Sequence, residues 1–247
     1  MSAAGERVAL VTGGARGLGF ACAERLADDG MRVALLDLDG DAAAAAAARL
    51  GEGHLGVGGD VTAAQDVAAA LARTTAALGA PTVLVNNAGL LRPTRFLEIS
   101  EAEWDAVLAV TVKGAFLCSQ ACLPAMVAAG FGRIVNFSST AGKNVSTLGG
   151  AHYTTAKAAM LGLTRAVAKE HAAHGVTVNA VCPGLFSTEM TLQTVPADVL
   201  ERYAASFPIP RLGTPEEVGA LVAFLCSENA AYITGAALDI NGGDLMV

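Results

Sequence analysis

The 247-residue sequence is poor in charged and aromatic side chains: 16% of its residues are charged, 5% are aromatic, and there is one tryptophan. Its lysines and arginines form no stripe or cluster, and the formal net charge is −7. A chain of this kind lacks the basic surface that attracts nucleic acid or an anionic membrane. We therefore expect no nucleic-acid partner and no membrane partner.

Several kinds of segment are also missing. The N-terminus lacks the order of basic, apolar and small residues that is typical of a secretory signal. No apolar run reaches the length that we expect of a membrane-spanning helix. No linker rich in Pro, Gly or Ser divides the chain, and no repeat is visible. We expect a cytoplasmic protein that forms one domain over residues 1–247.

Cysteine and histidine are sparse and scattered. The five cysteines include no C-x-x-C pair, and none of the four histidines stands at ligand spacing from them. We predict no metal site, and we expect buried, reduced thiols without a redox role. His152 stands beside Tyr153, and we expect it at the edge of a cleft. The cysteines are Cys22, Cys118, Cys122, Cys182 and Cys226.

Apolar residues, in contrast, make up 53% of the chain. Short runs rich in Leu or β-branched residues alternate with helical stretches, which is typical of a parallel sheet covered on both faces. We predict an α/β fold with a doubly wound parallel sheet (Rossmann) of about seven strands. The expected strands are 8–12, 33–37, 54–58, 83–86, 134–138, 176–182 and 237–240; the expected helices are 18–29, 41–50, 63–78, 101–129, 153–171 and 215–226.

One long stretch, from Ser187 to Thr214, shows no helical or strand pattern and contains Pro196, Pro208 and Pro210. A loop of that length is uncommon in a compact domain unless it is functional. We predict a substrate lid over residues 187–214.

A glycine-rich loop follows the first expected strand, with the sequence T-G-G-A-R-G-L-G over residues 12–19. Glycines permit a tight turn there and let backbone N–H groups and a helix N-terminus meet a diphosphate. The spacing differs from the general G-x-G-x-x-G fingerprint. We predict that this loop binds the phosphates of a dinucleotide through Gly13, Arg16, Gly17, Leu18 and Gly19.

Asp37 ends the second expected strand, twenty residues after Gly17, and Leu38 follows it. A carboxylate at this place accepts both ribose hydroxyls of an adenosine, whereas a 2′-phosphate meets like charge. Arg16 is the nearby cation that would receive such a phosphate, and we expect the acid to outweigh it. The pattern favours NAD over NADP, with a loop-capping carboxylate as the alternative.

Polar residues also end the third and fourth expected strands. Asp60 and Val61 offer a side-chain oxygen and a backbone amide to the adenine amine, and capping of the next helix is an equal alternative. The run N-N-A-G at residues 86–89 allows close backbone approach to a flat ligand. We give equal weight to two roles for Asn87, Ala88 and Gly89, namely contact with the cofactor and cross-linking of neighbouring strands.

Tyr153 and Lys157 are four residues apart in Y-T-T-A-K, which on a helix places phenol and ammonium on one face. A fixed cation beside a phenol lowers its pKa from about 10, which suits a general acid/base for an alcohol–ketone pair. Ser139, after the fifth expected strand, can donate to the same carbonyl oxygen. An ordinary exposed helix pair and turn-forming serines are the alternatives.

Together these residues resemble the compact, single-domain branch of the short-chain dehydrogenase/reductase family. The resemblance rests on T-G-x-x-x-G-x-G, N-N-A-G, a serine followed by Y-x-x-x-K, and P-G-x-x-x-T, and it covers nearly the whole chain. It implies that Tyr153 is the acid/base, that Lys157 holds the nicotinamide ribose and that Ser139 orients the carbonyl. It also implies a homotetramer, and a nicotinamide flanked by Pro183, Gly184, Phe186 and Thr188.

The chain departs from the family pattern at Thr111, where the family usually has an Asn that supports a water-linked proton path to the lysine. The backbone carbonyl remains, and a threonine hydroxyl can bond back to the preceding turn, so we expect an altered relay. The interval from Ser139 to Tyr153 is one residue longer than is common in the family, which we expect to reshape the pocket at residues 143–150.

The expected activity is reversible hydride transfer between NAD(H) and a small apolar secondary alcohol or ketone. A reductase of 3-oxoacyl thioesters of CoA or acyl carrier protein is the enzyme alternative. A dinucleotide-binding regulator or scaffold is the alternative outside enzymes. The candidates for an apolar substrate pocket are Leu90, Leu91, Val145, Leu148, Phe186, Met190 and Phe207.

Overall fold

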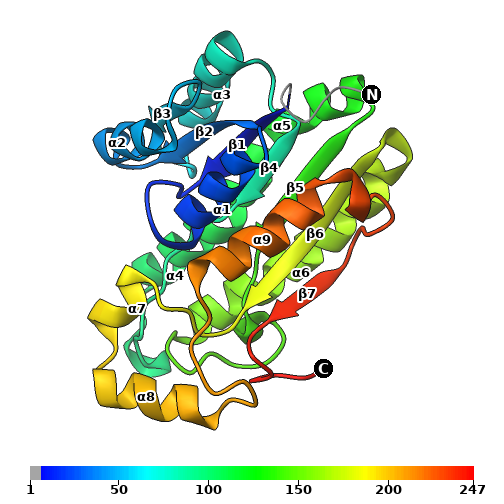
Figure 1. Ribbon diagram of the computed structural model, residues 1–247. Coiled ribbons are helices and arrows are strands. Elements are labelled where there is room, and N and C mark those ends of the chain that lie inside the picture. The colour runs from blue at the N-terminus through cyan, green and yellow to red at the C-terminus, as the bar shows by residue number, and fades with distance from the viewer. Residues whose placement is uncertain (1–6) are drawn as a thin grey trace.

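The computed structural model describes residues 7–247, except for the side chains of Met190, Gln193 and Thr194. Seven parallel strands form one sheet in the order β3-β2-β1-β4-β5-β6-β7 (Figure 1). This confirms the predicted doubly wound α/β fold, with strand ends shifted by at most two residues. The strands are β1 (Val8–Thr12), β2 (Arg32–Asp37), β3 (Leu55–Gly58), β4 (Val83–Asn86), β5 (Gly132–Phe137), β6 (Val176–Pro183) and β7 (Ala237–Ile240).

Helices cover both faces of the sheet because its central strands are apolar on both sides. On one face, α1 (Gly17–Asp28), α2 (Gly40–Leu50) and α9 (Pro215–Cys226) pack over a core that includes Phe20, Leu26 and Val222. On the other face, α3 (Ala64–Leu78), α5 (Gly114–Ala129) and α6 (Ala151–His171) contribute Val67, Met126 and Ala168. The expected helices in these places are confirmed.

The helix before β5 is continuous from Glu101 to Ala129. It consists of α4 (Glu101–Leu108), a π-helical turn η3 (Ala109–Lys113) and α5. One 18-residue window of this helix has a mean hydropathy of 1.6, so the helix is long and apolar enough to cross a membrane by length and composition alone, a criterion that buried core helices also meet. Part of this apolar character has a local cause, since Cys118, Cys122 and Met126 are buried against the sheet.

The order of connections reverses between β1 and β4, and ligands bind at such a switch point in open α/β sheets. Thr12 pairs with Asn86 at this edge, where both strands end. Asn86 Nδ2 donates to Asn136 Oδ1 on β5 at 2.8 Å and to Ser119 Oγ on α5 at 3.1 Å. Within the run N-N-A-G, Asn86 therefore cross-links β4 to β5 and α5.

The prediction of an irregular stretch over residues 187–214 is wrong, because it contains α7 (Glu189–Thr194) and α8 (Ala197–Ser206). Thr188 caps α7 by accepting a hydrogen bond from the Thr191 amide at 3.2 Å. Leu200 is the buried anchor of α8. Figure 1 shows α7 and α8, in yellow and orange, beyond the end of the sheet and apart from the helices that cover its faces.

All five cysteines are buried free thiols, as expected. Burial raises the pKa of the Cys118 thiol to about 12. Thiols of this kind are inert toward redox and metal chemistry because the thiolate is the reactive form. Among residues 7–247, no group of three or more His, Cys, Asp or Glu side chains is arranged to hold a metal ion.

Candidate active site

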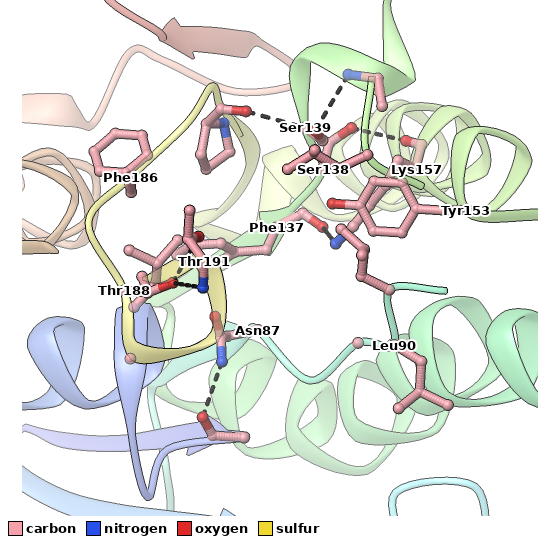
Figure 2. A pocket seen from close by; sticks show the side chains of 18 of the residues that line it. Asn87, Leu90, Phe137, Ser138, Ser139, Tyr153, Lys157, Phe186, Thr188 and Thr191 are labelled. Carbon is pink, nitrogen blue, oxygen red and sulfur yellow. Dashed lines mark hydrogen bonds between the residues drawn. The ribbon is translucent and has the colours of Figure 1, made fainter. Parts of the chain in front are cut away.

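A cavity of about 980 Å³ runs along the carboxyl ends of the strands. Its walls extend from Gly13 and Asp37 at one end to Tyr153 and Phe207 at the other. The volume lies at the upper end of the range of about 300 to 1,000 Å³ typical of small-molecule sites. Figure 2 shows the phenol of Tyr153 pointing into this space, with Phe186 on the opposite side.

The glycine-rich loop closes one end of the cavity. Gly13 and Gly17 adopt positive φ angles of 60° and 57°, which side chains rarely permit. A Cβ on Gly19 would lie 2.2 Å from the Gly13 carbonyl oxygen, so the loop and α1 approach too closely for any side chain. Asn87 Nδ2 donates to the carbonyl oxygens of Thr12 and Gly13 at 3.1 and 2.9 Å. These contacts hold a backbone cradle at the start of α1 that fits a diphosphate.

Asp37 lies beside this loop. Its Oδ2 accepts a hydrogen bond from the Ala15 amide at 3.2 Å, and its Oδ1 accepts one from the Asp39 amide at 3.4 Å. The loop-capping role of this carboxylate is therefore present, and Asp37 also lines the cavity. Arg16 lines the same end and is exposed, and so is Leu38.

Of the residues predicted to bind the cofactor, all except Gly19 line the cavity. Asp60 Oδ1 accepts a hydrogen bond from the Thr62 amide at 2.8 Å, so this carboxylate caps the turn before α3. The Thr188 hydroxyl is engaged with Thr191 at the start of α7. The further cavity-lining residues of this set are Leu18, Val61, Asn87, Ala88, Gly89, Pro183, Gly184 and Phe186.

The reactive side chains meet at the ends of β5 and α6. Lys157 Nζ donates to the Phe137 carbonyl oxygen at 2.8 Å and lies 5.6 Å from the centre of the Tyr153 ring. Ser139 Oγ accepts a hydrogen bond from the Ala141 amide at 3.2 Å. The neighbouring Ser138 donates to the backbone carbonyl of Lys157 at 2.7 Å, which fixes α6 to the end of β5. The structure thus brings Ser139, Tyr153 and Lys157 together at one wall.

Burial dominates the acid–base properties of this wall. It raises the pKa of the Tyr153 phenol, and a hydrogen bond with Ser139 opposes that rise. It also lowers the pKa of the Lys157 ammonium to about 8. The phenol pKa is therefore raised in this geometry and not lowered as expected, because loss of solvation outweighs the hydrogen bond with Ser139.

Thr111 lies in the π-helical turn η3, 1% exposed. Its Oγ1 has no hydrogen-bond partner among the described residues, so the expected bond back to the preceding turn is absent. A Cβ built on Gly89 would lie 3.5 Å from Lys157 Nζ and 3.6 Å from Thr111 Oγ1. The hydroxyl and the ammonium therefore flank the same glycine.

His152 is not at the cleft edge, as the sequence suggested. Its side chain is fully buried and faces Glu103 on α4 at 2.7 Å. The histidine is thus directed away from the cavity, although Tyr153 beside it lines the cavity.

The far end of the cavity is mostly apolar. Tyr203 on α8 and Leu245 near the C-terminus line it with Asp244, and sequence reasoning missed all three. The fold alone brings these segments to the site, since nothing in their local pattern marks them. The side chain of Met190 lies outside the described residues. The expected apolar wall residues found there are Leu90, Leu91, Val145, Leu148, Phe186 and Phe207.

The chain resembles known oxidoreductases over almost its whole length. Residues 13–244 match the profile of a family described as enoyl-(acyl carrier protein) reductase. The 2-(S)-hydroxypropyl-CoM dehydrogenase 3 of Xanthobacter autotrophicus is 42% identical over 247 residues, with 96% of each chain covered. The acetoacetyl-CoA reductase of Rhizobium meliloti is 42% identical over 239 residues, which cover 96% of this chain and 98% of that one.

A solved structure supports the same relationship. The crystal structure of a 3-oxoacyl-[acyl-carrier protein] reductase from Brucella melitensis matches with a TM-score of 0.92 and 32% identity. The match covers 98% of this chain and 92% of that one.

Proposed function

Because this chain belongs to the short-chain dehydrogenase/reductase family, it is an oxidoreductase that acts on CH–OH groups, and we propose that it uses NAD(H) and small apolar secondary alcohols or ketones. The observation that carries this proposal is the meeting of Ser139, Tyr153 and Lys157 on a cavity that also contains the glycine-rich loop. When bound, the dinucleotide accepts a hydride from the carbinol carbon or returns it to the carbonyl carbon.

The residues of the chain bind and orient the reactants and move one proton. The backbone cradle of Gly13, Gly17 and Gly19 holds the diphosphate, and Lys157 holds the nicotinamide ribose. Ser139 donates a hydrogen bond to the carbonyl oxygen of the substrate. The raised pKa of Tyr153 keeps the phenol protonated at neutral pH, so it gives its proton to that oxygen during reduction.

Pro183, Gly184, Phe186 and Thr188 form the wall for the nicotinamide in this proposal. The position of Phe186 supports it: the backbone of Phe186 pairs with Gly213, and a Cβ on Gly213 would meet the Phe186 ring at 2.3 Å. Phe186 is 4% exposed, and its ring packs closely against Gly213. A fixed ring suits a wall for a flat ligand.

We assign the proton path to Thr111 and Lys157. We propose that a water bridges Thr111 Oγ1 and Lys157, because the buried Oγ1 has no hydrogen-bond partner among the described residues and an orphan buried hydroxyl costs about 1 to 3 kcal/mol. The proton lost by Tyr153 is then replaced through Lys157 and this water. The altered relay keeps a hydroxyl where the family usually has an amide.

The preference for NAD over NADP rests on Asp37. Its carboxylate lines the adenosine end of the cavity and is fixed by the Ala15 amide. A 2′-phosphate placed there meets like charge, while the exposed Arg16 offers weaker, screened attraction. Measurement of kcat/KM with NADH and with NADPH tests this, and a preference for NADPH would refute it.

The substrate end favours a small uncharged molecule. Its walls are mostly apolar, and its charged lining groups besides Lys157 are Arg92, Glu189 and Asp244. A site for the phosphates of CoA or for an acyl carrier protein is expected to have an excess of basic residues, and these groups supply no such excess.

The thioester alternative is favoured by the names of the relatives, which include an acetoacetyl-CoA reductase and a (3R)-3-hydroxyacyl-CoA dehydrogenase. A panel of short ketones, secondary alcohols and acetoacetyl-CoA, assayed by NADH absorbance, distinguishes the two. Higher kcat/KM with ketones than with acetoacetyl-CoA supports the primary proposal. The reverse order selects the thioester activity.

A regulator or scaffold without turnover is the third possibility, and Thr111 is the departure that suggests it. The assembled wall of Ser139, Tyr153 and Lys157 argues against it. Ketone-dependent oxidation of NADH in the same panel would dispose of it.

The proposal also covers the oligomeric state and the segment of residues 187–214. We infer a cytoplasmic homotetramer of single-domain subunits, in which α5 and α6 pack against their mates. An apolar groove between these helices supports it, since it is lined by Leu123, Val127 and Val167 and by the half-exposed Phe116. Sedimentation velocity tests the tetramer. Residues 187–214, with α7 and α8, form the lid over the substrate.

A further inference from the structure

We propose that His152 and Glu103 position the catalytic Tyr153, and this inference rests on the proposed function. His152 precedes Tyr153 in the first turn of α6, and Glu103 lies 49 residues earlier, on α4. His152 Nε2 lies 2.7 Å from Glu103 Oε1, and the Tyr153 amide donates to His152 Nδ1 at 2.9 Å. The imidazole therefore bridges the backbone of the catalytic tyrosine to a second helix.

The two contacts determine which nitrogen carries the proton. Because the Tyr153 amide is a donor, His152 Nδ1 must be unprotonated to accept its hydrogen bond. Nε2 then carries the hydrogen and donates it to the Glu103 carboxylate. The ring is fully buried, so both of its nitrogens are satisfied by these two partners. This arrangement fixes both the tautomer and the orientation of the ring.

Glu103 is itself held by its surroundings. A hydrogen bond from Thr94 and one from His152 lower the pKa of its carboxyl, so the carboxylate is charged at neutral pH. Ser100 Oγ accepts a hydrogen bond from the Glu103 amide at 3.2 Å and caps α4. The carboxylate thereby joins α4, the loop after β4 and the first turn of α6 at one point.

The same loop contacts the start of α6 directly. The Gly150 amide donates to the Arg92 carbonyl oxygen at 2.8 Å. A Cβ on Gly150 would lie 2.4 Å from the Thr94 carbonyl oxygen and 2.9 Å from His152 Cε1. The loop that supplies Leu90 and Leu91 to the substrate pocket is therefore packed against the turn that carries His152. Glu103, His152 and Gly150 thus form one joint between this loop and α6, and the position of the phenol depends on it.

The contacts of Glu103 and His152 determine the position of Tyr153 more than they stabilise the fold. The Tyr153 amide also donates to the Gly150 carbonyl oxygen at 3.1 Å, so it keeps a partner when the imidazole is removed. What is lost is the constraint on the direction in which the first turn of α6 presents Tyr153. A displacement of about 1 Å at a catalytic group can cost about a hundredfold in rate.

The test compares five variants of the full-length protein with a ketone that the wild type reduces. His152→Leu removes both contacts of the ring, and Glu103→Leu removes one. Glu103→Gln keeps an oxygen acceptor for His152 Nε2. The double variant Glu103→Leu/His152→Leu tests whether the two act as a unit. His174→Leu, at an exposed position just after α6, is the matched control.

We expect His152→Leu and Glu103→Leu to lower kcat about tenfold or more, with KM for the ketone and Kd for NADH within about twofold of the wild type. Glu103→Gln and His174→Leu stay within about twofold of the wild-type kcat. The double variant falls no further than His152→Leu alone, because members of one unit are not additive. The kcat values are compared on protein whose thermal unfolding shows it to be folded.

Folded His152→Leu and Glu103→Leu with wild-type kcat would overturn this inference and leave the proposed function intact. A loss of kcat matched by an equal loss of NADH affinity would also overturn it, because that marks a general structural role. If His152→Leu does not fold, the pair Glu103→Leu and Glu103→Gln decides the question, since Glu103 is partly exposed. A wild type that reduces no ketone or thioester overturns the proposed function and this inference together.

Discussion

The ammonium nitrogen of Lys157 lies 5.6 Å from the centre of the Tyr153 ring and donates a hydrogen bond to the Phe137 carbonyl oxygen. The cation is therefore placed beside the aromatic ring, and its hydrogen bond goes to the backbone of β5. In this geometry burial raises the pKa of the phenol and lowers that of the ammonium to about 8. Both groups are shifted toward their uncharged forms, which brings the pKa of the ammonium closer to neutral pH and moves that of the phenol further from it.

A first prediction concerns the cost of the buried ammonium. Burial lowers the pKa of Lys157 to about 8, so below that pH the folded state contains a buried positive charge that destabilises it relative to the unfolded chain. Between that pH and the ordinary lysine value of about 10.4, the unfolded chain binds the extra proton, so wild-type stability rises with pH. Lys157→Met removes this dependence. We expect the variant to unfold at higher urea concentration than the wild type at pH 7.

The margin between the two proteins should shrink as pH rises from 8 to 10. Urea titrations followed by circular dichroism at pH 7, 8.5 and 10 measure it. Lys169→Met, at an exposed position on the same helix, is the control and should show no such trend. A margin that is constant with pH would show that the charge of Lys157 is not penalised by the fold.

A second prediction concerns cofactor choice. Asp37→Asn keeps the size of the side chain and an oxygen acceptor for the Ala15 amide. It removes the negative charge that faces a 2′-phosphate, and like-charge contacts cost several kcal/mol. We expect the ratio of kcat/KM for NADPH to that for NADH to rise by at least about tenfold. An unchanged ratio would mean that another residue selects the cofactor. Asp41→Asn, at an exposed position on α2, is the control.

A third prediction concerns the close approach in the glycine-rich loop. In Gly19→Ala the new Cβ would lie 2.2 Å from the Gly13 carbonyl oxygen. This oxygen belongs to the backbone, which cannot move aside as the end of a flexible side chain can. We expect a loss of about 1 to 3 kcal/mol in the free energy of unfolding and a large rise in the Kd of NADH. Gly162→Ala, on α6 with no atom near its Cβ, should instead stabilise by about 0.5 to 1 kcal/mol. Equal NADH affinity in Gly19→Ala and the wild type would contradict the role of the loop.

A fourth prediction concerns the unpartnered hydroxyl of Thr111. Thr111→Val keeps the shape and removes the hydroxyl, so the relay loses a member and kcat should fall. Thr111→Asn supplies the amide that the family usually carries and should restore or raise kcat and change the pH profile. Solvent and pH dependence of kcat for both variants measure this. If Thr111→Val has wild-type kcat and pH profile, the hydroxyl takes no part in proton transfer.

The sheet and its covering helices could be predicted because their signals are local. Apolar runs such as Val8–Thr12 form strands wherever both faces are covered, and the motif order fixed the elements that follow them. The helices α7 and α8 were missed because they are short and separated by Pro196. Their stability comes from distant packing, such as the burial of Leu200, which no local period reveals.

The site was predictable to a similar degree. Spacing alone placed Tyr153 and Lys157 on one helix face, and both line the cavity. Spacing could not reveal the degree of burial, which reverses the expected pKa shift of the phenol. The partner of His152 was also hidden, because Glu103 is far away in sequence and only the packing of α4 against α6 brings them together.

The central claim is that the phenol of Tyr153 supplies the proton in hydride transfer, and Tyr153→Phe tests it most directly. The variant keeps the ring and loses only the hydroxyl. Steady-state NADH oxidation with the best ketone should show kcat lowered by about a hundredfold or more, while fluorescence titration gives a wild-type Kd for NADH. Turnover retained at the wild-type level, with the same Kd, would contradict the account.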